Sequence, residues 1–207
     1  MDTKKIFRNA MIDLMKEHSF EEITVQMILD QSTLSRSTFY RYYKDKYDLL
    51  NDYYQAGVIS IFENEHYDSW EFYLKAIYTF MLDHFEYFRK ALSVDCTNSF
   101  YDFLYEFSYD FVKKAYMKVK QTDTVDVKAR IAIGYITKGQ AHTLKMWIMH
   151  GAKESVEDMS HWAYELITED YREILDSYCV KMQKQHQDKV KEVETEIGKN
   201  TARAVLG

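Results

Sequence analysis

The side chains of this sequence that are best suited to chemistry gather between residues 35 and 46. Four of them are basic and stand against a single acid, Asp45; they are Arg36, Arg41, Lys44 and Lys46. Hydroxyl and aromatic groups lie among them, namely Ser35, Ser37, Thr38, Tyr40 and Tyr42. Guanidinium, ammonium and hydroxyl groups bind phosphate oxygens, and some of these side chains also reach base edges. The cluster therefore predicts a surface that binds nucleic acid.

The charge of the chain as a whole shows that this cluster is local. Residues 1–50 contain eight Lys or Arg and eight Asp or Glu, whereas the complete sequence has a formal net charge of -6. The acidic excess thus belongs to the part after residue 50. This balance makes a wholly basic nucleic-acid coat improbable and leaves room for a basic patch on one element.

Helical periodicity and capping residues predict how the cluster is positioned. Apolar residues recur at helical spacing over residues 4–18. Thr24, Ser35 and Asp45 are placed as N-caps, because their side-chain oxygens accept hydrogen bonds from first-turn amides. Thr24 is expected to open a helix over residues 25–31. Ser35 is expected to open a helix that runs to Tyr43, and Asp45 a longer helix that runs toward Phe62. Residues 24–43 then have the form of a helix-turn-helix, with Phe39 as the inward anchor of the second helix.

The run ITVQMILDQSTLSRSTFYRYYKDKYDLL, residues 23–50, resembles the DNA-binding region of the tetracycline-repressor (TetR) family of bacterial transcriptional regulators. The resemblance implies that Thr24 and Lys46 hold phosphates at helix N-termini. It also implies contacts to DNA backbone or bases from Arg36, Thr38, Tyr40 and Tyr42, with Ser35, Ser37 and Arg41 as additional contacts. The family commonly has Ala-Gly in the turn where this sequence has Ser32-Thr33, and a β-branched residue is poorly suited to a positive φ.

Composition predicts that the whole chain is all-α. The 207 residues include no proline and 6 glycines, so the residues that make tight turns and break helices are scarce. The apolar residues, at 46%, suffice for a substantial core. The two cysteines are far apart, which excludes a disulfide-stapled secreted scaffold. No signal peptide and no apolar run of membrane-spanning length are found, so we expect a cytoplasmic protein without membrane contact. The family resemblance implies that it is bacterial and nucleoid-associated.

The segment 100–111, FYDFLYEFSYDF, is expected to be a helix with three stripes. At helical spacing its Phe residues fall on one side, its acids on another, and its Tyr residues between them. The Phe stripe is expected to be core. The family resemblance implies that helices between residues 69 and 119 enclose an effector pocket, which makes the Tyr stripe the candidate lining: Tyr101, Tyr105 and Tyr109.

The segment 131–151 is apolar around most of its circumference, because its formal charges are limited to Lys138 and Lys145. Such a helix is buried on more than one side. Ser155 and Asp158 resemble a capping box that opens the next amphipathic helix. The run 139–166 is similar to the regulatory region of one TetR branch, in which two such helices form a four-helix dimer seam. The resemblance implies a homodimer whose interface includes Trp147, Met159, Trp162 and Leu166.

These observations predict a DNA-binding domain over residues 1–50, a helical regulatory and dimerisation domain over 51–182, and a charged extension over 183–207. The predicted function is a sequence-specific transcriptional regulator that binds a near-palindromic operator in double-stranded DNA as a homodimer. We expect it to be a repressor that a small-molecule effector releases.

Two other functions share part of this evidence. One is an architectural or nucleoid-associated DNA-binding factor without an effector, and the other is an all-helical enzyme or carrier for an apolar ligand. The sequence contains no phosphate-binding Gly-rich loop, no Gly-x-Ser-x-Gly and no His-Glu-x-x-His motif. Its histidines, among them His142, His150 and His161, show no tight metal-binding spacing. We therefore predict that it is not an enzyme and has no cofactor or metal.

Overall fold

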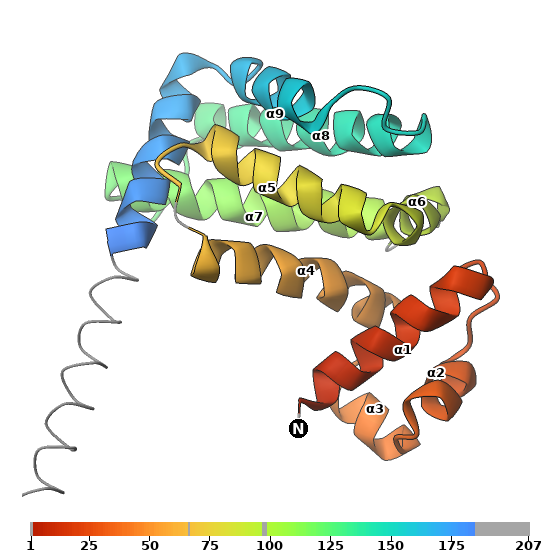
Figure 1. The fold of residues 1–207 in the computed structure, drawn as a ribbon. Coiled ribbons are helices and arrows are strands. Elements are labelled where there is room, and N and C mark those ends of the chain that lie inside the picture. The colour runs from red at the N-terminus through yellow and green to blue at the C-terminus, as the bar shows by residue number, and fades with distance from the viewer. Residues whose placement is uncertain (1, 66, 97–98, 185–207) are drawn as a thin grey trace, which may run out of the picture.

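The computed structural model describes residues 2–65, 67–96 and 99–184. Within these ranges the chain is helical and contains no strand, so the all-α prediction is confirmed (Figure 1). Residues 169–184 are also helical, and the extension expected over 183–207 lies outside the described residues from position 185 onward. The helices are α1 (Thr3–Glu17), α2 (Val25–Ser32), α3 (Arg36–Tyr42), α4 (Lys46–Asn64), α5 (Trp70–Asp83), α6 (Phe85–Ser93), α7 (Phe100–Lys120), α8 (Val127–Met149) and α9 (Val156–Glu165).

Local capping chemistry fixes where α2, α3 and α4 begin. The Thr24 hydroxyl accepts a hydrogen bond from the Met27 amide at 3.2 Å. The Ser35 hydroxyl accepts one from the Thr38 amide at 3.2 Å. The Asp45 carboxylate accepts from the first-turn amides of α4. All three predicted N-caps are confirmed, because each satisfies amides that have no partner within the helix.

The turn between α2 and α3 holds a non-glycine residue in the left-handed region. Thr33 has φ 57° and ψ 21° at the C-terminal end of α2. Relatives with glycine at such a position meet no steric conflict, whereas a Cβ atom there lies too close to the backbone. The backbone therefore adopts the conformation that a glycine favours, at a cost that the rest of the unit must offset.

Thr33→Gly should raise the free energy of unfolding by about 0.5–1 kcal/mol, since relief of the left-handed strain exceeds the added chain entropy of glycine. Denaturant unfolding monitored by circular dichroism measures the change. Thr33→Ala is the control, because it keeps the Cβ atom and should recover less than the glycine variant. A glycine variant no more stable than the parent would show that Thr33 is not strained.

The DNA-binding unit, α1 to α3, packs around aromatic rings. Phe39 is fully buried, as predicted for the inward anchor of the second helix. Its ring meets that of Phe7 edge-on, with centroids 5.4 Å apart, and that of Tyr43 at 5.5 Å. This cluster joins α3 to α1, so α3 presents its opposite side to solvent.

The helices after α4 form a second, layered unit, which we call the regulatory unit after the domain predicted over residues 51–182. In Figure 1, α8 and α9 lie on one side of α5 and α7, and α4 lies on the other side and leads to α1–α3. Polar pairs tie α9 to α5: His161 Nδ1 lies 2.9 Å from a Glu71 carboxylate oxygen, and the Lys75 ammonium lies 2.7 Å from Glu157. The Glu71 hydrogen bond raises the pKa of His161, against the opposing effect of desolvation. His161 thus links α9 to α5 at the protein surface.

Helix α4 passes through both units, so the expected domain boundary after residue 50 falls inside a helix. Its C-terminal half lies close to α5 at Gly57, where a Cβ atom would sit 2.2 Å from the Phe80 ring. Tyr54, also on α4, contacts the rings of Phe100 and Phe107 edge-on. Ring contacts therefore hold α4 against α5 and α7, and its N-terminal part packs against the DNA-binding unit.

Candidate nucleic-acid interface

The outer side of the helix-turn-helix carries the residues that the sequence suggested. The side chains of α3 that point away from Phe39 are exposed, with Tyr40 at 50% and Tyr42 at 40%. Thr38 is partly buried, and the remaining predicted contacts of this surface are exposed: Thr24, Ser35, Arg36, Ser37 and Arg41. The structure thus brings eight of the nine predicted residues to one helix-turn-helix surface, with donors and rings available to solvent.

Hydrogen bonds organise the start of α3. The Ser35 hydroxyl lies 2.9 Å from the Ser37 hydroxyl and 2.8 Å from the Thr38 hydroxyl. The Arg36 guanidinium donates to the Gln26 side-chain oxygen at 3.1 Å. Gln26 in turn donates to Asp30 at 2.8 Å. The guanidinium keeps further donors for a phosphate, and its position is set from α2.

Gln26 is a site residue that the sequence reasoning missed. It stands two residues after the N-cap Thr24 and is exposed on α2. Its exposed polar side chain, two residues after the predicted N-cap Thr24, is the signal that could have found it. The Gln26 side-chain oxygen accepts from Arg36, so Gln26 positions a residue that is predicted to contact DNA.

The expected phosphate contact from the Lys46 side chain requires a correction. Its ammonium donates to the Phe20, Glu21 and Ile23 carbonyl oxygens at 2.8, 3.0 and 2.7 Å. It also lies 4.6 Å from the centroid of the Phe20 ring. Desolvation lowers the pKa of Lys46, although Glu21 opposes the shift. An ammonium has three donors. All three are engaged with the loop between α1 and α2, so the side chain braces this loop.

A second lysine holds the other end of the same loop. Lys90, on α6, donates to the Met15 carbonyl at 2.6 Å and to the His18 carbonyl at 2.9 Å. The carbonyl groups of the last turn of a helix have no partner within that helix. Lys90 thus caps the C-terminus of α1 from the regulatory unit.

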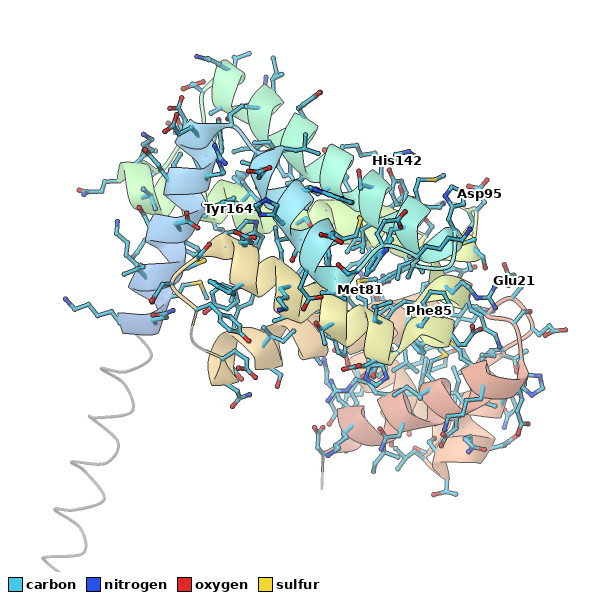
Figure 2. All side chains as sticks on the ribbon, turned by 45° about the horizontal axis from the view of Figure 1, so that its top comes forward. Glu21, Met81, Phe85, Asp95, His142 and Tyr164 are labelled. Carbon is cyan, nitrogen blue, oxygen red and sulfur yellow. The ribbon has the colours of Figure 1, made fainter. Side chains whose placement is uncertain are left out.

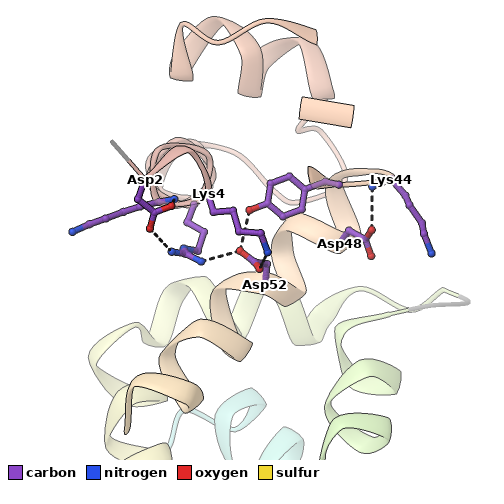
Figure 3. A network of polar contacts seen from close by, with 8 residues as sticks. Asp2, Lys4, Lys44, Asp48 and Asp52 are labelled. Carbon is purple, nitrogen blue, oxygen red and sulfur yellow. Dashed lines mark hydrogen bonds and ion pairs between the residues drawn. The ribbon is translucent and has the colours of Figure 1, made fainter. Parts of the chain in front are cut away.

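One carboxylate joins the DNA-binding unit to α4 (Figure 3). Asp52 accepts hydrogen bonds from Lys4 at 2.8 Å, Arg8 at 3.0 Å and the Tyr43 hydroxyl at 2.9 Å. Burial raises the pKa of Asp52, but the bonds from Lys4 and Tyr43 and the charges of Lys4 and Arg8 outweigh burial and hold it below its usual value. The sequence reasoning missed this contact. Its signal was the pair Lys4 and Arg8, four residues apart on α1.

Two of the four residues expected at a dimer seam face the interior of their own subunit. Trp147 is 4% exposed, and its indole donates to the Glu154 carbonyl at 3.2 Å. Met159 is 6% exposed. These two expectations are corrected, because the core of the regulatory unit already covers both side chains. Trp162 and Leu166, at 47% and 80%, face solvent, and their place at a dimer seam stays a prediction.

An apolar strip of exposed side chains runs along α8 and continues on α9. His142, labelled on α8 in Figure 2, is exposed in the same strip. We call the following residues the α8–α9 face: Ile131, Tyr135, His142, Met146, Met149, Trp162 and Leu166. Contiguous exposed apolar side chains of this kind mark protein interaction sites.

The Tyr stripe of α7 packs against α8, which corrects the expectation that it lines a pocket. The Lys138 ammonium lies 4.5 Å from the centroid of Tyr101 and 4.4 Å from that of Tyr105. Tyr109 lies beside Gly134. Cations over ring faces are attracted by the ring quadrupole. Helix α8 therefore covers the Tyr stripe. In the Phe stripe, Phe100 is fully buried, and Phe103, Phe107 and Phe111 are partly buried against the core.

A small cavity of about 50 Å³ lies among α4, α5, α7 and α8. The side of α7 that faces it carries Phe107, Ser108 and Phe111, and none of the three predicted tyrosines. Rings of α4 and α5 complete its aromatic wall: Tyr54, Phe62, Trp70 and Tyr78. The cavity is thus next to the Phe stripe, and the lysine-covered tyrosines do not line it.

No group of three or more His, Cys, Asp or Glu side chains that could hold a metal occurs in the part of the chain that the structure describes. A search of the same residues for a helix of sufficient length and apolarity to cross a bilayer found none.

The fold and the site together define a helix-turn-helix transcriptional regulator. Residues 9–53 match the family model described as bacterial regulatory proteins, tetR family, and residues 68–169 match a model described as a transcriptional regulator C-terminal region. The chain belongs to the TetR family of DNA-binding transcriptional regulators.

Among curated proteins, the chain is similar to the HTH-type dhaKLM operon transcriptional activator DhaS of Lactococcus lactis subsp. lactis (strain IL1403). The two are 24% identical over 94 residues, which are 45% of this chain and half the length of that protein.

Two solved structures show the same fold. One is the dihydroxyacetone kinase operon activator DhaS, with a TM-score of 0.57, 20% identity and coverage of 80% of this chain and 94% of the other. The second is a TetR transcriptional regulator from Streptococcus agalactiae 2603V, with a TM-score of 0.55, 24% identity and coverage of 80% and 93%.

Proposed function

We propose that this chain is a homodimeric repressor that binds a near-palindromic operator through residues 24–42 and is released by a small-molecule effector. The observation that carries the DNA-binding part is the exposed side of α3, on which Arg36, Tyr40, Arg41 and Tyr42 project from a helix fixed by buried Phe39. Phosphate contacts supply salt-dependent affinity, and base contacts in the major groove supply sequence preference.

The α8–α9 face supports the dimer. Both helices contribute exposed apolar side chains to it, so the same face of a second copy can cover it. A two-fold axis would place each helix beside the unlike helix of the partner, which is self-complementary. Two recognition helices about 34–36 Å apart, or somewhat more, would then enter successive major grooves.

Effector control is proposed as a population shift. The cavity touches α4, and α4 carries the Asp52 contact to the DNA-binding unit. A ligand that prefers a conformer with wrongly spaced recognition helices lowers operator affinity, and DNA weakens ligand binding by the same factor. A bound ligand that leaves operator affinity unchanged at saturation would contradict this proposal.

Activation is the alternative sign of regulation, because the Lactococcus relative is named a transcriptional activator. Transcription in vitro from a promoter that carries the selected site distinguishes the two signs. Added protein should lower transcript yield if it is a repressor and raise it if it is an activator. We place the protein in the cytoplasm, where bacterial DNA lies.

Selection of bound duplexes from a random DNA pool, at two salt concentrations, tests the proposed function. A two-fold symmetric consensus is the expected result. Salt-sensitive binding without sequence preference would favour the architectural factor, and absence of binding would favour the helical enzyme or carrier.

Arg36→Ala should weaken specific and non-specific DNA binding alike and reduce the slope of log affinity against log salt by about one. The reason is the loss of one cation from the phosphate contacts. Binding titrations over a range of salt concentrations measure the slope.

Lys46→Ala is the matched comparison, since it removes one positive charge from the same cluster. Its ammonium is engaged with three carbonyls, so we expect a lower unfolding temperature and an unchanged slope. Equal slopes for Arg36→Ala and the parent would remove Arg36 from the phosphate contacts.

A further inference from the structure

The wall of the cavity carries rings, aliphatic groups and a few neutral polar groups. Its polar side chains are those of Tyr54, Trp70, Tyr78, Ser108 and Gln140, and no Asp, Glu, His, Lys or Arg lines it. Burial raises the pKa of Tyr54 and of Tyr78 well above 10, so both hydroxyls are neutral at physiological pH. The Gln140 amide already donates to the Ala163 carbonyl at 3.1 Å. A charged ligand would therefore enter without a counter-charge.

Trp70 is a wall residue with an unused, buried donor. The residue is 6% exposed, and its indole Nε1–H is buried without an acceptor among the described residues. The position of Trp70 is fixed from outside the cavity, because its backbone amide donates to the Asp176 carboxylate at 2.7 Å. A buried donor without a partner costs about 1–3 kcal/mol. An acceptor on a ligand would remove that cost.

The rings beside Trp70 are nearly parallel to it. The Phe111 ring lies 5.0 Å away at an interplanar angle of 21°, and the Phe62 ring lies 6.3 Å away at 13°. Phe62 and Phe111 also stack on each other at 5.0 Å and 22°. Parallel ring faces contact a flat molecule over its whole area.

The small volume of the cavity means that part of its wall must move before a ring-sized ligand can bind. At about 50 Å³ the cavity is about one-third of an engineered cavity of about 150 Å³ that takes benzene. Phe62, Phe107 and Phe111 are only half-buried, whereas Trp70 and Tyr54 are buried. Displacement of the half-buried rings is therefore the route to a larger site, and Phe62 belongs to α4.

We propose that this cavity binds a small, flat, uncharged molecule that stacks among Phe62, Phe111 and Trp70 and offers a hydrogen-bond acceptor to the Trp70 indole. The inference rests on the proposed function in that it defines the chemical class of the effector. Seating such a molecule displaces Phe62 and with it the C-terminal end of α4.

Three probes of nearly equal shape test the inference on the full chain without DNA. They are 2-acetylnaphthalene, which is neutral with an acceptor, naphthalene, which has no acceptor, and 2-naphthoate, which is charged. Equilibrium dialysis should give saturable binding of both neutral probes, about tenfold tighter for the ketone because it satisfies the indole. Binding of 2-naphthoate should be at least about a hundredfold weaker than that of the ketone, because its charge is desolvated without a partner.

Trp70→Phe keeps a ring and removes the donor, so the ketone should lose its advantage over naphthalene while naphthalene still binds. Trp147→Phe is the matched control, since it removes an indole that is already paired with Glu154 outside this wall; the tenfold preference should persist. Naphthalene binding reports an intact site in both variants.

Absence of saturable binding by the neutral probes overturns the inference, as does equal binding of the carboxylate or a preference that survives Trp70→Phe. These measurements involve no DNA, so such failures leave the selected operator, and hence the DNA-binding function, untouched. Failure of the duplex selection, conversely, would leave the probe result standing as evidence for a carrier.

Discussion

Ile131→Glu is expected to make the protein monomeric and to lower its affinity for a symmetric operator at least about a hundredfold, because the second half-site would no longer be bound by a tethered partner. Ile131 is 66% exposed on the α8–α9 face. A carboxylate within an apolar interface would lose its hydration without a compensating partner. Sedimentation equilibrium measures the oligomeric state, and operator titration measures the affinity.

Ile59→Glu provides the matched control for this change. Ile59 is also an exposed isoleucine, but it lies on α4, outside the α8–α9 face. Its variant should remain dimeric. A dimeric Ile131→Glu protein, or a monomeric protein with full operator affinity, would contradict the proposed dimer.

Asp52→Asn is expected to lower the free energy of unfolding by about 1–3 kcal/mol, because three hydrogen bonds to a charged group lose their charge at once. The Asp52 side chain is 15% exposed, but its partner Lys4 is 43% exposed, so solvent screens part of the contribution. Operator affinity should fall as well, since the contact fixes the DNA-binding unit on α4. Denaturant unfolding and operator titration measure the two effects.

The same carboxylate predicts a pH dependence. The folded state holds the pKa of Asp52 below its usual value, despite the opposing effect of burial. Its contribution is therefore fully present above the unfolded value of about 3.9 and is lost as the pH falls through the lower folded value. The Asn variant should lack this part of the acid destabilisation. Unfolding curves between pH 2 and about 6 measure it.

Asp2→Asn is the control for both measurements. Asp2 also contacts Arg8, but at 3.4 Å and with its side chain 58% exposed. Its replacement should change stability little. If Asp2→Asn and Asp52→Asn had equal effects, Asp52 would have no special place in joining the two units.

The features predicted correctly from the sequence are those decided within a few residues. N-caps such as Thr24 and Ser35 act on amides three positions away, so sequence spacing specifies them. Phe39 was also placed correctly, because periodicity separates the buried side of a short helix from its exposed side. The helix-turn-helix surface follows from these two local rules.

The residues placed incorrectly depend on neighbours distant in sequence. Periodicity groups Met159 and Trp162 on one amphipathic helix, but only the position of α5 and α8 decides which is core. Periodicity separates the Tyr stripe of α7 from its Phe stripe, but only the position of α8, whose Lys138 covers Tyr101 and Tyr105, decides which stripe lies beside the cavity. Lys46 has a long side chain, and the loop between α1 and α2 provides the carbonyls that determine its direction.

The lysine that caps α1 from α6 limits how this regulator can be recombined with others. A chimera that transplants residues 1–50 onto a foreign regulatory domain would leave behind Lys90, and with it the donor for the Met15 and His18 carbonyls. An exchange of DNA specificity between relatives is therefore expected to succeed where the recipient has a basic side chain at the corresponding place in α6. The part of this chain that must be transferred to exchange DNA specificity therefore extends beyond the helix-turn-helix and includes Lys90 on α6.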